Sequence, residues 1–178
     1  MKKNLLYLTM IVSLLCSFSI KLSAQETQTT PVKILVLCTG NSCRSQMAHG
    51  FLQAMDPTLY VRSAGVKPAA RVNPKAVQVM KEVGIDISDH TPHNVTEYMD
   101  EPWDFVITVC DNANKTCPVF NGKVKARMHI GFDDPSEATG SDEYIMSEFR
   151  RVRDLIKARF TQFYNEQVKF QNVEKVVE

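Results

Sequence analysis

Residues 32–45 read VKILVLCTGNSCRS, and this stretch decides the fold. Its first part, 32–37, is apolar apart from one lysine, which predicts a strand buried on both faces of a sheet. The loop 39–43 contains glycine, asparagine and serine, which favour a tight turn. A helical pattern begins at Ser45. The sequence therefore predicts a strand that passes into a helix through a short polar loop.

Cys38 and Arg44 stand at the two ends of this loop, with five residues between them. Inward N–H groups and the positive end of a helix dipole attract an anion, and the planar arginine side chain offers further donors to oxyanion oxygens. The same field favours the thiolate of Cys38, which is the nucleophilic form. We interpret the stretch as an oxyanion pocket with a sulfur nucleophile. The alternative is a buried cysteine and an unrelated surface arginine.

Strand and helix patterns alternate along the rest of the chain. Helices are expected at 45–55, 73–84 and 141–170, and strands at 60–63, 103–109 and 126–132. This alternation predicts a single α/β domain, residues 31–170, with a four-stranded parallel sheet and helices on both faces. Ligands of such sheets bind at the carboxyl ends of the strands. Cys38, Cys110 and the turn 133–135 each follow a strand, so we expect them to meet at one edge.

The N-terminal segment has the pattern of an export signal. Two lysines precede an apolar stretch, 5–20, and small residues follow it. We expect 1–24 to be a cleaved signal peptide, 25–30 to be a polar tether, and the mature protein to be exported, in the periplasm. An uncleaved membrane anchor is the alternative, and it is the only expected route to a membrane contact. Residues 171–178 receive no assignment.

Composition limits the partners. The 178 residues carry a net charge of +1, without a basic stripe, which argues against a nucleic-acid partner. The mature chain would hold four cysteines, and in an exported protein this even number suggests disulfides with three possible pairings.

Cys110 and Cys117 lie seven positions apart, just past a strand. A rigid helix between them would separate their Cα atoms by about 10 Å, which is too far for a disulfide. The pair can bond only if the segment bends or unwinds. Two interpretations stay open: a redox pair on a mobile loop, and a permanent structural disulfide. A zinc site that uses nearby histidines has no standard spacing here.

Asp134 belongs to an Asp-Asp-Pro turn after the last expected strand. Such a turn can hold a carboxylate rigidly at the edge of a site, where it can act as general acid for a leaving oxygen. Plain turn chemistry is the alternative.

Six segments of the chain carry a family resemblance. They are CTGNSCRSQMA at 38–48, SAG at 63–65, VNP at 72–74, MKEVGIDIS at 80–88, Cys110 with Cys117-Pro118, and GFDDP at 131–135. Together they resemble the thioredoxin-coupled arsenate reductases, which share the fold of the low-molecular-weight protein tyrosine phosphatases. The resemblance runs from about 32 to about 156. The oxyanion loop is common to both groups, whereas the Cys110/Cys117 pair favours the reductase.

The resemblance implies that arsenate lies in the loop. Ser45 would donate a hydrogen bond to the Cys38 thiolate, Cys38 would attack arsenic, and Asp134 would protonate the leaving oxygen. The positions that would bind the substrate are Thr39, Gly40, Asn41, Ser42, Cys43 and Arg44.

The same resemblance implies a disulfide cascade. Cys110 would attack the Cys38 sulfur, so that arsenite departs, and Cys117 would then attack Cys110 and release Cys38. A thioredoxin-like dithiol would reset the enzyme by exchange. We expect a small oxyanion substrate, a monomer, and no metal or organic cofactor.

Members of the resembling family often bind potassium beside the loop through an asparagine, a serine and two carboxylates. Asn41 and Ser63 match, but the carboxylate positions hold His49 and His93. Neutral imidazole does not replace carboxylate for a hard cation, so we expect no potassium dependence.

Two other functions remain open at this stage. The first is a phosphatase of the same fold, which hydrolyses phosphate monoesters and does not use Cys110 or Cys117. The second is a non-catalytic exported binder whose cysteines form structural disulfides.

Overall fold

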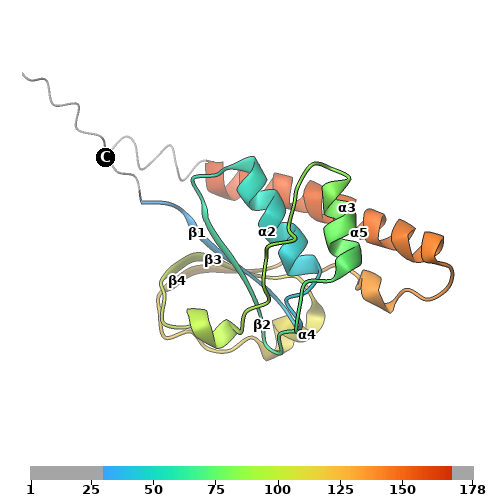
Figure 1. Ribbon diagram of the computed structural model, residues 1–178. Coiled ribbons are helices and arrows are strands. Elements are labelled where there is room, and N and C mark those ends of the chain that lie inside the picture. The colour runs from blue at the N-terminus through green and yellow to red at the C-terminus, as the bar shows by residue number, and fades with distance from the viewer. Residues whose placement is uncertain (1–29, 170–178) are drawn as a thin grey trace, which may run out of the picture.

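The computed structural model describes residues 30–169 (Figure 1). Its strands are β1 (Lys33–Cys38), β2 (Tyr60–Gly65), β3 (Trp103–Thr108) and β4 (Val124–His129). Its α-helices are α2 (Arg44–Met55), α3 (Pro74–Lys81), α4 (Asp111–Thr116) and α5 (Asp142–Phe163). Two 3₁₀ turns, η1 (Val95–Tyr98) and η2 (Pro135–Glu137), and one π-helical turn, η3 (Tyr164–Val168), complete the order. The expected signal peptide, tether residues 25–29 and the tail 171–178 lie outside the described residues.

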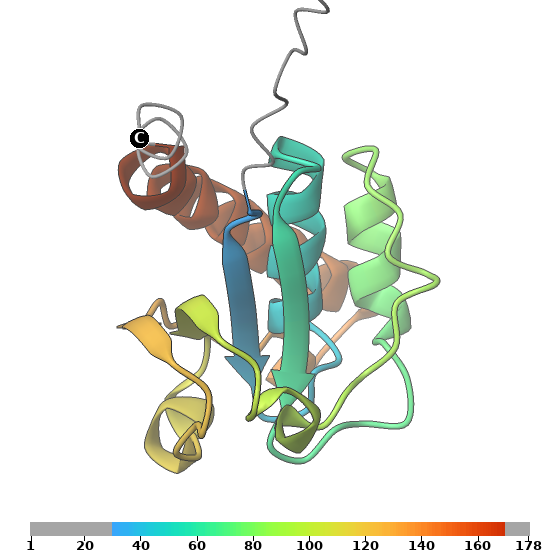
Figure 2. The same ribbon diagram turned by 90° about the vertical axis from the view of Figure 1, so that its left-hand side faces the viewer.

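All four strands are parallel, in the order β2-β1-β3-β4. Figure 2 shows this order, from orange β4 through β3 and blue β1 to teal β2. The central strands are almost wholly buried, whereas the side chains of the edge strand β4 alternate between half-buried and exposed. The predicted fold class, a single α/β domain with a four-stranded parallel sheet, is confirmed.

The two faces of the sheet are covered unequally. The long helices α2, α3 and α5 lie on one face (Figure 1), where Ile34 and Val36 of β1 share a core with Met47 and Ile156. Because successive side chains of a strand point to opposite faces, Leu35 and Leu37 of β1 enter a second core on the other face. That second core is closed by η1 and by Phe120, with Trp103 buried at its centre.

Local sequence signals explain most element boundaries. Asn73 caps α3, and its side-chain oxygen accepts from the backbone N–H of Lys75 at 2.9 Å. Ser141 caps α5 in the same way. Gly84 has a φ of 79°, which favours glycine and lets the chain turn away after α3.

Several predicted boundaries were wrong. β2 continues to Gly65, two residues past its expected end, and α3 ends at Lys81, three residues before its expected end. The strand expected at 126–132 is β4, which begins at Val124 and ends at His129. The backbone N–H groups of Ile130 and Phe132 still donate to the carbonyls of Thr108 and Val109. Because β3 ends at Thr108, the ladder between the two strands stops there and β4 ends with it. The helix expected to reach 170 keeps α-helical hydrogen bonding only to Phe163 and continues as the π-helical turn η3.

Parallel pairing brings the carboxyl ends of the strands to one edge, and the loops that follow β1, β3 and β4 gather there. In the part of the chain that the structure describes, no helix is both long and apolar enough to cross a membrane.

Candidate active site

The loop between β1 and α2 is held from outside by the segment that follows β2. Three of its carbonyl groups accept hydrogen bonds of 2.8–2.9 Å from backbone N–H groups of that segment. The pairs are Thr39 with Lys67, Gly40 with Ala69, and Ser42 with Asn73. Because these carbonyls point outward, the loop presents its N–H side to the cavity, as an anion site requires.

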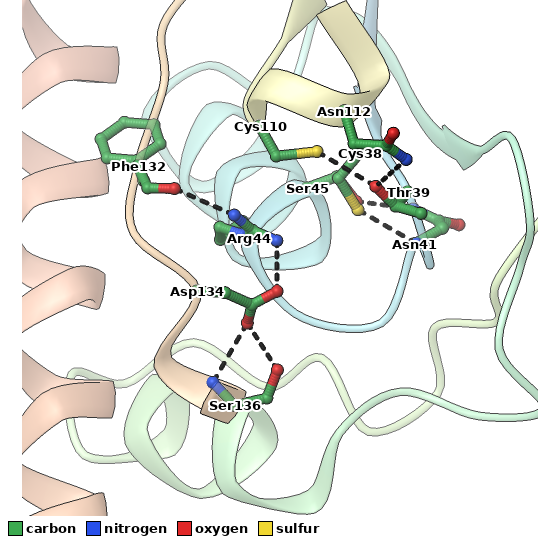
Figure 3. Close-up of polar contacts among 10 residues, drawn as sticks. All are labelled: Cys38, Thr39, Asn41, Arg44, Ser45, Cys110, Asn112, Phe132, Asp134 and Ser136. Atoms are coloured by element: carbon green, nitrogen blue, oxygen red, sulfur yellow. Dashed lines mark hydrogen bonds and ion pairs between the residues drawn. The ribbon is translucent and has the colours of Figure 1, made fainter. Parts of the chain in front are cut away.

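Cys38 lies at the floor of the loop, with 4% of its surface exposed. Its sulfur is 3.0 Å from the Ser45 hydroxyl and accepts the N–H of Asn41 at 3.0 Å (Figure 3). Burial raises the pKa of the Cys38 thiol above its ordinary value, and the hydrogen bonds from Ser45 and Asn41 offset this rise only in part. The start of α2 at Arg44 adds the positive end of a helix dipole. The contact expected between Ser45 and Cys38 is therefore present, and these donors suit a thiolate.

Arg44 already has partners at the cavity wall. One guanidinium nitrogen donates to the Phe132 carbonyl at 2.9 Å, and the other forms an ion pair with Asp134 (Figure 3). The Asp134 carboxylate also accepts from the Ser136 N–H at 3.0 Å. The contacts with Phe132 and Asp134 use two of the five N–H donors of Arg44, so the guanidinium can bind an oxyanion while Asp134 stays beside it.

Cys110 shares the cavity with Cys38, although the two lie 72 positions apart in the sequence. Its sulfur is 3.4 Å from the hydroxyl of Thr39, which in turn accepts from the Asn112 amide at 3.1 Å. Figure 3 shows both thiols on the side of the loop that faces α4. A second sulfur is thus positioned beside the nucleophile.

The cavity has a volume of about 950 Å³. Eight of the eleven predicted site residues line it: Cys38, Thr39, Gly40, Ser42, Cys43, Arg44, Cys110 and Asp134. The other three, Asn41, Ser45 and Cys117, do not. Asn41 was expected to contact the substrate, but this loop residue is fully buried. Ser45 is also buried, in contact with Cys38.

Cys117 lies elsewhere in the structure. It is half-buried in a separate hollow of about 420 Å³, lined also by Arg127 and His129. The guanidinium of Arg127 approaches its sulfur at 3.9 Å. Helix α4 fills the interval between Cys110 and Cys117, and all four described cysteines are free thiols. The structure therefore brings two of the three predicted redox cysteines together and keeps the third apart.

The histidines expected beside the loop do not offer a hard-cation site. His49 Nδ1 lies 3.3 Å from the Ser63 hydroxyl, and its ring lies 4.6 Å from that of His90. The ring of His93 pairs with Glu97 instead, while its backbone N–H donates to the Asn41 side chain. Burial lowers the pKa of His49 to about 3, so this ring is neutral at ordinary pH. The neutral ring of His49 does not replace a carboxylate as a ligand for potassium.

Three groups at the site were not predicted from the sequence: the Asn112 amide, the Phe132 carbonyl and the Ser136 N–H. Each is a near neighbour in sequence of a predicted site residue. A backbone carbonyl carries no sequence signature, and the amide reaches the loop only because α4 begins directly after β3.

The chain is similar to known proteins in both sequence and fold. The family model described as low molecular weight phosphotyrosine protein phosphatase matches residues 33–175. An arsenate reductase of Halalkalibacterium halodurans is 47% identical over 131 residues, which cover 73% of this chain and 93% of the relative. A solved structure of an arsenate reductase in the phosphate-binding state aligns with a TM-score of 0.61 at 30% identity, covering 76% of this chain and 98% of that one. An arsenate reductase in the oxidized state aligns with a TM-score of 0.60 at 29% identity, covering 73% and 94%. The chain belongs to the low-molecular-weight phosphotyrosine protein phosphatase family, in the branch of the arsenate reductases.

Proposed function

We propose that this protein reduces arsenate to arsenite through a cascade of cysteine thiols. The observation that carries the proposal is a second thiol, Cys110, in the same cavity as the buried nucleophile Cys38. A phosphate monoesterase needs one sulfur, an acid and an arginine, so a second sulfur beside the first has no task in that reaction.

The first step joins sulfur to arsenic. Arsenate enters the loop and is held by the Arg44 guanidinium and the loop N–H groups. Cys38 sulfur attacks arsenic(V), and one hydroxyl group of arsenate leaves as water after it takes a proton from Asp134, which has itself taken that proton from solvent. No electrons are transferred in this step.

The second step transfers two electrons. The Cys110 thiolate attacks Cys38 sulfur, the new S–S bond forms, and the S–As bond breaks with its electron pair going to arsenic. Arsenic(V) becomes arsenic(III), which leaves as arsenite. Cys117 then attacks Cys110 and releases Cys38 as thiolate. An external dithiol of the thioredoxin type reduces the Cys110–Cys117 disulfide by exchange.

Two assays separate this function from phosphatase activity. Steady-state arsenate reduction is measured with thioredoxin, thioredoxin reductase and NADPH, and phosphate ester hydrolysis is measured with p-nitrophenyl phosphate. We expect Cys117→Ser to stop after a single turnover of arsenate, because Cys38 cannot be released. The same variant retains its rate with p-nitrophenyl phosphate, which serves as the control for an intact pocket. Multiple turnovers of arsenate by Cys117→Ser would refute the cascade.

Phosphate ester hydrolysis is the second candidate function, favoured by the family model and by the presence of Cys38, Arg44 and Asp134 in one cavity. It becomes the main function if the fully reduced protein turns over p-nitrophenyl phosphate but not arsenate.

We further propose that the protein works as a monomer after export to the periplasm. The export rests on the sequence pattern of 1–24, and it requires a dithiol reductant in the same compartment, because an oxidising environment would otherwise trap the Cys110–Cys117 disulfide. Mass spectrometry of the protein purified from a cell-envelope extract tests it. A mature N-terminus near residue 25 is expected, and an intact Met1 in the cytoplasmic fraction would contradict it.

A further inference from the structure

Gln46 is a buried polar residue that has no role in the proposed reaction steps. It follows Ser45 on α2, is 1% exposed and does not line the cavity. A buried amide carries a free-energy cost unless its donors and acceptor are satisfied. The partners of Gln46 therefore indicate what the side chain does.

The amide of Gln46 joins the oxyanion loop to the segment before η1. Its Nε2 donates toward the backbone carbonyl of Asn41 at 3.0 Å, the Asn41 side-chain oxygen at 3.2 Å and the Thr91 carbonyl at 3.1 Å. Its Oε1 lies 2.9 Å from Nδ1 of His90. Since Oε1 can only accept, His90 supplies the proton, and this bond fixes which end of the amide faces Asn41.

Asn41 is the loop residue that needs support. Among the described residues it is the one non-glycine with a positive φ, 47°. In this conformation its N–H points at Cys38 sulfur, and its side-chain amide donates to the Ser45 hydroxyl at 2.8 Å. With its oxygen occupied by that amide, Ser45 directs its own proton to the sulfur. Both hydrogen bonds to Cys38 thus depend on the conformation of Asn41.

We propose that Gln46 is a positioning residue for the nucleophile. It holds Asn41 in the left-handed conformation and so aims two donors at the Cys38 thiolate, while His90 sets the orientation of the Gln46 amide. The outward carbonyls of Thr39, Gly40 and Ser42 are held by separate bonds. Loss of Gln46 should therefore weaken the attack by sulfur more than the binding of the anion.

The first test uses Gln46→Met and Gln46→Glu, which keep the length of the side chain. Methionine removes the donor, and glutamate replaces it with an acceptor that repels the carbonyls of Asn41 and Thr91. The pseudo-first-order rate of Cys38 alkylation by iodoacetamide is measured against pH. Gln46→Met leaves unchanged the charged and titratable groups that face the sulfur, namely Cys43, Cys110, Arg44 and Asp134, whereas Gln46→Glu adds a carboxylate, so the methionine variant decides the outcome. We expect the alkylation midpoint to move to higher pH, with a roughly tenfold slower rate at pH 7.

Further measurements separate positioning from a merely structural role. In the arsenate assay kcat should fall by roughly tenfold while KM changes less than threefold. Phosphate affinity, measured by calorimetry, should likewise change less than threefold. Gln78→Met, an exposed glutamine on α3, is the matched control and should change none of these quantities.

His90→Phe serves if the Gln46 variants fail to fold, because it removes only the proton that orients the amide. A smaller shift of the alkylation midpoint in the same direction supports the proposal. A lower melting temperature with an unchanged midpoint and unchanged kcat, in any variant, would overturn it. Only the arsenate arm rests on the proposed function: a shifted midpoint without arsenate turnover in the unmodified protein would contradict that function and leave the role of Gln46 standing.

Discussion

At the scale of single residues, the environment of one sulfur controls the chemistry. Ser45 places its hydroxyl 3.0 Å from Cys38 sulfur, and this bond lowers the pKa that burial raises. Ser45→Ala should therefore raise the pKa of Cys38 and shift its alkylation by iodoacetamide to higher pH, with a roughly tenfold slower rate at pH 7. Stopped-flow or mass-spectrometric alkylation measures this. An unchanged pH profile would show that the hydroxyl does not stabilise the thiolate.

Gly65 is required by close packing and not by its backbone angles. A Cβ atom at this position would lie 2.6 Å from the Thr39 carbonyl oxygen and 2.9 Å from the Asn41 nitrogen. Both are backbone atoms of the oxyanion loop, so Gly65→Ala must displace the loop. We expect kcat/KM for arsenate to fall by about 10²-fold. Gly84→Ala is the matched control, because it strains a positive φ far from the cavity and should lower stability by about 1 kcal/mol without changing kcat/KM. Equal activity losses in both variants would contradict this account.

At the scale of elements, α4 decides whether the cascade can finish. It has six residues, below the length at which an isolated helix persists in water, and it begins and ends beside a cysteine. Cys117 reaches Cys110 only if α4 unwinds. Amide hydrogen exchange should therefore be at least tenfold faster in 111–116 than in the packed helix α2, and faster still after oxidation to the Cys110–Cys117 disulfide. Protection of α4 equal to that of α2 would count against the required unwinding.

At the scale of the whole molecule, a half-buried histidine makes stability depend on pH. His49 has an Nε2 atom without a hydrogen-bond partner, and its pKa is lowered from 6.5 to about 3. Between these values the unfolded chain binds a proton at this position and the folded protein does not. Acidification from pH 6.5 to 3 should therefore lower the free energy of unfolding, by about 2–4 kcal/mol through His49 alone.

His49→Gln removes the titrating ring, so urea unfolding as a function of pH checks this expectation. The variant should lose less stability on acidification than the unmodified protein. Parallel stability curves for the two proteins would locate the acid sensitivity in other groups.

Local patterns determined which elements this chain forms and which residues carry its chemistry. Apolar runs, the Asn73 and Ser141 caps and the turn residues after Cys38 act over a few positions, so the strands, the helices and the oxyanion loop could be predicted from them. The convergence of Cys38, Cys110 and Asp134 followed from the rule that the carboxyl ends of parallel strands meet at one edge of a sheet. Boundaries such as the end of β4 depended on where a neighbouring strand stops, and so they were missed.

Tertiary structure alone decided the state of the site. The pairing of Arg44 with Asp134 and the bonds from Gln46 to Thr91 and His90 join residues whose approach depends on packing between elements. No local pattern encodes such approaches, because the free energy that selects them comes from the burial of the whole core and not from neighbouring residues.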